Sequence, residues 1–201
     1  MTFLLAVLLA AAPAGASPAP KAPQLVDATA VVPELALELR YATEDNFLKK
    51  RLYERPVCLL RPEVAQRLAR AQRTLMKQGF RLKAWDCYRP LSVQREMWNA
   101  VPVRGLVAPP DRGGSNHNRG AAIDCTLVTL AGEPVEMPTD FDSFTREAHA
   151  TSPLPSKAAR RHRDLLRAAM LEAGFTPVRL EWWHYDAPDA KSFPTLDAPL
   201  R

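Results

Sequence analysis

The 201-residue chain has no internal repeat and no long run of basic residues. Its net charge is only +5, and its lysines and arginines are interspersed with acids, as in residues 160–164. Such scattered charge is typical of a solvated helix surface, whereas nucleic-acid binding usually leaves a basic stripe or patch. We therefore expect no nucleic-acid partner. The length fits one domain.

Long apolar runs are also scarce. The one long run lies at the N-terminus. Residues 3–12 form an uncharged apolar segment too short to span a bilayer, and Ala14-Gly15-Ala16 follows as a cleavage motif. We interpret residues 1–16 as a signal peptide and residues 17–24 as a Pro-rich leader, with one domain over 25–201. The alternative, a buried N-terminal helix, fits poorly with the Ala/Pro-rich stretch that follows. The chain is thus expected to be secreted or periplasmic, with no membrane span after cleavage.

Cysteine is scarce too, with Cys58, Cys87 and Cys125 as the full set. Their spacing does not suggest a cysteine zinc site. In an oxidising compartment an odd count permits one disulfide and one remaining thiol. We favour a Cys58–Cys87 pair, while three buried thiols remain the alternative.

Hydrophobic periodicity and breakers outline the secondary structure. Helices are expected from Pro62 to near Gly79, over 91–100, and from a Ser156 cap to Gly174. Strands are expected over 80–85, 120–130 and 179–185, with a hairpin completed by 130–137 and a loop over 101–116. These elements predict an α+β fold: a small, mostly antiparallel sheet with helices packed on one face and the functional site at the sheet.

The segment from Ser115 to Asp124 reads Ser-x-His-x-x-Gly-x-Ala-x-Asp and offers His117 and Asp124 as metal ligands. Gly120 permits a tight backbone between the two, and a second imidazole, His184, occurs in Glu-Trp-Trp-His. Three N/O ligands with a free carboxylate nearby are typical of a catalytic zinc site, whereas a structural site is closed by four protein ligands. The motif therefore predicts one zinc ion per chain, used for hydrolysis.

Glu181 is the free carboxylate, three residues before His184. On a flat strand these two side chains would face opposite sides, so they share a site only where the chain bends or bulges. Trp182 and Trp183 are expected to surround Glu181 with apolar surface, which raises a carboxyl pKa toward the range of a general base. Arg89, at the end of the strand over 80–85, is a candidate donor to the oxyanion of a tetrahedral intermediate.

Five segments together resemble the VanX-type D-alanyl-D-alanine dipeptidases, zinc peptidases within a wider group acting on peptidoglycan D-amino-acid links. The resemblance runs from Tyr41 to Tyr185, and its segments are residues 41–47, 85–90, 115–127, 141–142 and 181–185. It implies zinc bound by His117, Asp124 and His184.

The resemblance further implies catalytic roles for Glu181, as base, and Arg89, as transition-state donor. It implies substrate contacts from Ser115, Tyr41 and Asp142, with Asp142 the partner of the dipeptide ammonium. The expected substrate is the small dipeptide D-Ala-D-Ala; the oligomeric state is left open. Two alternatives remain: a D,D- or L,D-carboxypeptidase on longer stem peptides, and a non-catalytic zinc-bearing cell-wall-binding module. The module would normally lack the spare carboxylate and the arginine.

Overall fold

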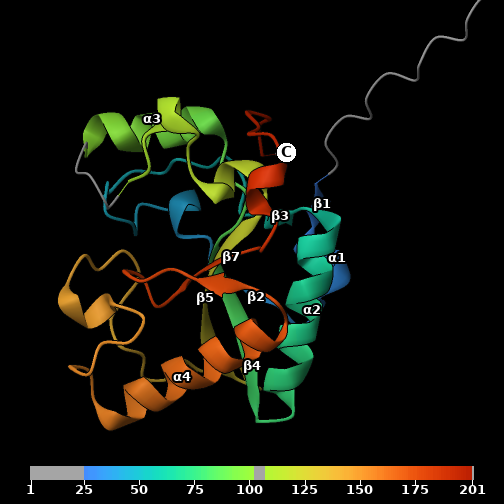
Figure 1. Cartoon of the computed structure of the whole chain (residues 1–201), viewed down its shortest axis with the longest axis vertical. Coiled ribbons are helices and arrows are strands. Elements are labelled where there is room, and N and C mark those ends of the chain that lie inside the picture. The colour runs from blue at the N-terminus through green and yellow to red at the C-terminus, as the bar shows by residue number, and fades with distance from the viewer. Residues whose placement is uncertain (1–24, 102–106, 201) are drawn as a thin grey trace, which may run out of the picture.

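The computed structural model describes residues 25–101 and 107–200 (Figure 1). The predicted signal peptide and leader lie outside these residues. The strands are β1 (Val26–Asp27), β2 (Ala36–Leu37), β3 (Leu59–Leu60), β4 (Phe80–Asp86), β5 (Ala122–Thr129), β6 (Thr176–Pro177) and β7 (His184–Asp186). The α-helices are α1 (Ala28–Val31), α2 (Pro62–Met76), α3 (Leu91–Ala100) and α4 (Lys157–Glu172). Short 3₁₀-helices occur at Arg40–Ala42, Pro110–Arg112, Asn116–Arg119, Arg146–Ala148 and Ala190–Ser192.

The sheet is mixed and has five strands in the order β2-β4-β5-β7-β6. The α+β class is confirmed, but the prediction of a small, mostly antiparallel sheet is wrong. Strand β2 runs parallel to β4, and β1 and β3 form a separate two-stranded pair. No local pattern predicts β2, because two residues are too few to show an alternation of apolar and polar side chains.

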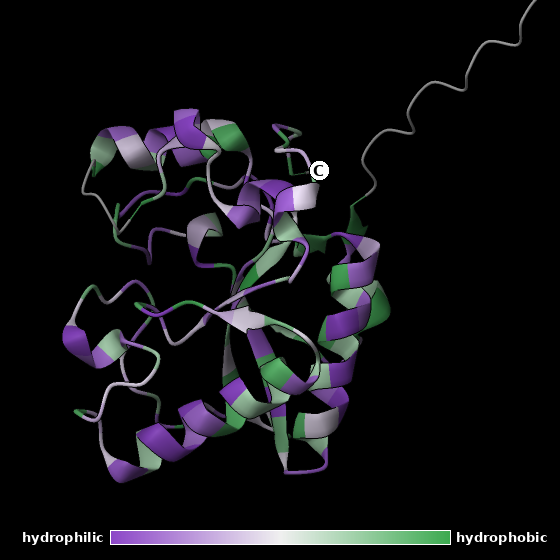
Figure 2. Ribbon diagram, in the orientation of Figure 1, coloured by the Kyte–Doolittle hydropathy of each residue, from purple (hydrophilic) through white to green (hydrophobic). Residues whose placement is uncertain are grey.

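Helices α2 and α4 contact each other and pack on the sheet, α2 against β4 and α4 against β5 and β6. Their ribbons alternate between hydrophilic and hydrophobic colours in Figure 2, as amphipathic helices do. Their apolar residues join the buried core together with the sheet residues Leu82, Ile123 and Leu127. Helix α3 lies apart from this layer and contacts the 3₁₀-helix Pro110–Arg112, so the helices do not all share one face (Figure 1).

Helix boundaries follow the sequence signals closely. Pro62 stands at the start of α2, the side chain of Ser156 accepts a hydrogen bond from the Ala159 amide at the start of α4, and α3 has the predicted bounds. The hairpin predicted beyond β5 is reduced to an isolated antiparallel bridge between Val128 and Pro134, and residues 130–137 form no second strand. No helix in the described ranges is long and apolar enough to cross a membrane.

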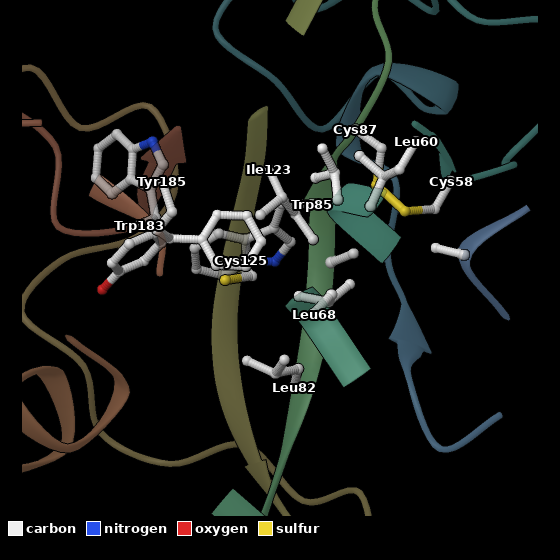
Figure 3. Close-up of a cluster of buried hydrophobic side chains, with 14 of the residues drawn as sticks. Cys58, Leu60, Leu68, Leu82, Trp85, Cys87, Ile123, Cys125, Trp183 and Tyr185 are labelled. Carbon is white, nitrogen blue, oxygen red and sulfur yellow. A yellow bond between two sulfur atoms is a disulfide. The ribbon is translucent and has the colours of Figure 1, made fainter. Parts of the chain in front are cut away.

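Two features at the end of β4 position residues of the functional site. A β-bulge between Ala84 and Asp86 shifts the register so that Asp86 lies opposite Asp124 of β5. The predicted disulfide is confirmed: Cys58, next to β3, is bonded to Cys87, just after β4, and Cys125 is a buried free thiol (Figure 3). The end of β4 is thereby fixed to the neighbouring strand pair.

Candidate active site

His117, Asp124 and His184 come together as a possible metal site, with their ligand atoms within 4.8 Å of one another. Asp124 on β5 lies directly opposite His184 on β7 in the antiparallel register. His117 stands in the 3₁₀-helix Asn116–Arg119, which precedes β5. All three side chains are nearly or fully buried.

The local fold of the motif explains its serine and glycine. The Ser115 hydroxyl accepts a hydrogen bond from the His117 amide and so caps the 3₁₀-helix that carries this imidazole. Gly120 ends the helix in the left-handed conformation, at φ 65°, and a Cβ there would collide with Leu25. The chain can then turn directly into β5, where Asp124 follows.

Outer contacts orient both imidazoles toward the same point. Nδ1 of His117 lies 2.6 Å from the backbone oxygen of Cys87, and Nε2 of His184 lies 2.9 Å from Oδ1 of Asp186. These acceptors place a proton on each of those nitrogens, so Nε2 of His117 and Nδ1 of His184 present lone pairs. The two lone-pair nitrogens are only 3.2 Å apart.

The Asp124 carboxylate completes this set of acceptors. Its Oδ1 lies 2.9 Å from Nδ1 of His184, and its Oδ2 lies 3.3 Å from Nε2 of His117. Oδ1 is buried and receives no hydrogen bond. When each imidazole keeps its proton on the outer nitrogen, three electron-pair donors face one another, and a cation among them offsets their repulsion. The residues therefore fit a metal ion, and their N/N/O donor set is one that zinc accepts.

Glu181 reaches this cluster through a turn instead of a strand bulge. Residues 181–183 precede β7, and the predicted strand from 179 is wrong in its first five residues. The turn brings Glu181 Oε2 to 3.8 Å from Nδ1 of His184, which meets the condition that the chain bend here. Burial raises the pKa of Glu181 above its ordinary value, while His184 lowers it. Trp183 shares the cavity with Glu181, but Trp182 turns away and donates its indole N–H to Thr139.

Arg89 is held by a buried network. Its Nε and Nη2 donate to Oδ2 of Asp86 at 3.0 and 2.6 Å, and its Nη1 donates to Gln94 at 2.9 Å. Burial acts to lower the pKa of Arg89, but Asp86 raises it well above the ordinary value, so the guanidinium stays charged. The guanidinium carbon lies 5.1 Å from the centre of the Tyr41 ring.

All eight sequence-predicted site residues line one cavity of about 370 Å³. At its side, Tyr41 donates its hydroxyl hydrogen to Oδ2 of Asp142 at 2.9 Å. Asp142 adopts a left-handed backbone, at φ 54°, which is uncommon for a residue other than glycine. Burial raises the pKa of Asp142 to about 8, although the Tyr41 hydrogen bond lowers it.

Three supporting residues were missed from the sequence. Asp86 binds Arg89, and its position three residues before Arg89 was the available signal. Asp186 binds His184; since strand residues two apart share a face, that spacing was also a signal. Gln94, on α3, carried no signal because its partner Arg89 lies beyond the N-terminal end of its helix.

Comparison with known proteins agrees with this geometry. The family model described as "D-ala-D-ala dipeptidase", of the M15 peptidases, matches residues 21–199. The chain belongs to this family. It is 38% identical to the D-alanyl-D-alanine dipeptidase of Escherichia coli (strain K12) over 173 residues, which cover 86% of this chain and 89% of the relative. It is 33% identical to that of Enterococcus faecium, over 82% of this chain and 92% of the relative.

A third relative, the D-alanyl-D-alanine dipeptidase of Enterococcus faecalis (strain ATCC 700802 / V583), is 34% identical over 76% of this chain and 85% of its own length. The resemblance stated from the motifs is thus confirmed, and the chain is a metallopeptidase of this dipeptidase family. The non-catalytic module and the carboxypeptidase are not favoured.

Proposed function

We propose that the protein hydrolyses D-Ala-D-Ala to two molecules of D-alanine, with one zinc ion bound by His117, Asp124 and His184. The observation that carries the proposal is the convergence of two imidazole nitrogens and a carboxylate oxygen beside Glu181 and Arg89 in one cavity. When bound, zinc supplies Lewis acidity and lowers the pKa of water. The relatives bear the name of this dipeptidase activity.

The chain's own residues account for the proton transfers. Glu181 takes a proton from the attacking water and returns it to the nitrogen of the leaving D-alanine, so the base is regenerated. Arg89 stabilises the negative charge that develops on the peptide carbonyl oxygen, and the Asp86 contact holds it in place. One water is consumed and one peptide bond is broken.

The substrate end is assigned to Tyr41, Asp142 and Ser115. The Asp142 carboxylate is the acceptor for the free ammonium of the dipeptide, and the Tyr41 hydroxyl keeps it oriented. Ser115 lines the same cavity and contributes a further polar contact. An acyl group on the substrate amine would leave this carboxylate without its ionic partner, which opposes binding of longer or blocked peptides.

The decisive experiment combines metal analysis with three substrates. Purified protein should contain one zinc per chain and cleave D-Ala-D-Ala, while N-acetyl-D-Ala-D-Ala and a stem pentapeptide should be poor substrates. Faster turnover of the pentapeptide would move the protein to the carboxypeptidases. A metal-loaded protein inert on all three would contradict the proposal.

The proposed place of action is outside the cytoplasm. The support is the apolar run over residues 3–12 followed by Ala14-Gly15-Ala16. N-terminal sequencing of the exported protein should begin at Ser17. A full-length protein that stays in the cytoplasm would overturn this assignment.

A further inference from the structure

Gln94 is a fully buried amide in contact with Arg89. It lies in the first half of α3, and its side chain lines the same cavity. Its Oε1 accepts a hydrogen bond from Nη1 of Arg89 at 2.9 Å, and its Nε2 donates one to the backbone oxygen of Ala108 at 2.8 Å. A cation on one side and a carbonyl on the other fix the orientation of the amide, because only the oxygen accepts and only the nitrogen donates.

Arg89 is gripped at two places by these contacts. Asp86 binds Nε and Nη2, which holds one edge of the guanidinium plane, and Gln94 binds Nη1. Three N–H groups are thus engaged, and the remaining ones are free for a ligand in the cavity. Asp86 places both of its contacts on one carboxylate oxygen, so a second contact at Nη1 is needed to stop the plane from rotating about that point.

We propose that Gln94 is a positioning residue for Arg89: it fixes Nη1 and so aims the free N–H groups at the peptide carbonyl oxygen. The inference rests on the proposed role of Arg89 in the dipeptidase reaction. The Gln94 amide also donates to the backbone oxygen of Ala108, which lines the cavity, so it connects Arg89 to this part of the lining. Stabilisation of a developing oxyanion requires donors already in place, so a rotated Arg89 binds substrate but stabilises the transition state less well.

The test is a double-mutant cycle between Gln94→Leu and Arg89→Ala, with kcat and KM measured on D-Ala-D-Ala. Gln94→Leu alone should lower kcat about tenfold with little change in KM, since one hydrogen bond to a charged group is lost. Affinity for a phosphinate analogue of the dipeptide, a tetrahedral mimic, should fall by a similar factor. In the Arg89→Ala background Gln94→Leu should have no further effect on either quantity.

Gln94→Glu separates the two contacts of the amide. It keeps an acceptor for Arg89 and removes the donor to Ala108, so it should retain several-fold more kcat than Gln94→Leu. Gln72→Leu is the matched control: Gln72 is an equally buried glutamine, bonded to the Leu82 amide and not among the cavity-lining residues. It should lose thermal stability and keep kcat.

Equal losses of kcat in both backgrounds would overturn the inference, as would an effect confined to KM or equal losses in Gln94→Leu and Gln94→Glu. An Arg89→Ala variant with unchanged kcat would overturn it together with the role of Arg89. Wild-type turnover of D-Ala-D-Ala tests the proposed function separately, because it does not depend on either variant.

Discussion

The two ends of the cavity are built from different kinds of secondary structure. At one end, called the metal end because it holds the candidate metal site, Asp124 and His184 are paired across neighbouring strands, and both imidazoles have outer hydrogen-bond partners. At the substrate end, Tyr41 stands on a 3₁₀-helix and Asp142 on a turn with a left-handed backbone.

This difference predicts which properties of the site a sequence change can alter without destroying it. Sheet register places Asp124 opposite His184, and a one-residue slip would remove Asp124 from the site. Turns and short helices tolerate sequence change, so substrate selection is the property that loop variation can alter. We therefore expect variants at the metal end to abolish activity and variants at the substrate end to redirect or weaken it.

The largest effect is expected for the two imidazoles of the candidate metal site. His117→Ala and His184→Ala should each lose bound metal and all measurable turnover, because two remaining donors bind zinc weakly. Metal content per chain, measured by mass spectrometry, checks this directly. His162→Ala, in a histidine that contacts the Glu136 backbone oxygen outside the cavity, should keep the metal. Full metal content in either ligand variant would show that the site is elsewhere.

Glu181→Gln should separate metal binding from catalysis at the metal end. The variant should keep zinc and lose about 10² to 10⁴ in kcat, the usual effect of removing a general base. Metal analysis and steady-state kinetics on the same preparation separate the two properties. Loss of zinc together with activity would instead identify Glu181 as a ligand or a structural residue.

Asp142→Asn tests the substrate end. It should lower kcat/KM by about tenfold or more, because the substrate ammonium loses a charged partner. In the wild type, Asp142 is protonated and neutral below its pKa of about 8, so kcat/KM should decline as pH falls through about 8. The Asp142→Asn variant should lack this pH dependence.

Tyr41→Phe removes a hydrogen bond that favours the charged form of Asp142, so it should move the decline in kcat/KM to higher pH. An unchanged pH profile in Asp142→Asn would remove this residue from substrate binding.

Asp186→Asn sharpens the comparison within the metal end. The Asp186 carboxylate contacts Nε2 of His184 from outside the candidate metal site, and loss of such a partner typically weakens metal affinity about 10- to 100-fold. Competition with a chelator measures this affinity. Asp189→Asn, at an exposed position nearby, serves as the control. Equal affinities in the two variants would mean that the His184 ring is fixed by other contacts.

The same contrast explains what could be predicted from the sequence. The grouping of His117 with Asp124 was predictable because the Ser-x-His-x-x-Gly-x-Ala-x-Asp spacing encodes a capped turn followed by a strand, and both parts form as expected. The Glu181–His184 spacing predicted a bend, although the residues before His184 form a turn and not a strand. Local signals thus located the metal end well.

The unpredicted parts depend on contacts between distant segments. Strand β2 is short and gains its place only by pairing with β4, so no local pattern could reveal it. Gln94 reaches Arg89 from α3, and Trp182 donates to Thr139 and packs against Trp85. Propensity and periodicity describe neighbours along the chain, and these contacts are decided by tertiary packing.

The smallest effect on activity is expected from the disulfide. Cys87 supplies the backbone oxygen that orients His117, yet the Tyr88 amide also donates to the Leu59 oxygen at 2.9 Å. The double variant Cys58→Ser/Cys87→Ser should therefore lose about 3 kcal/mol of unfolding free energy, since the bridge spans 29 residues, while kcat stays within about twofold. Denaturant unfolding and kinetics below the transition measure the two quantities. Loss of metal from the folded variant would contradict the expectation and make the bridge part of the metal end.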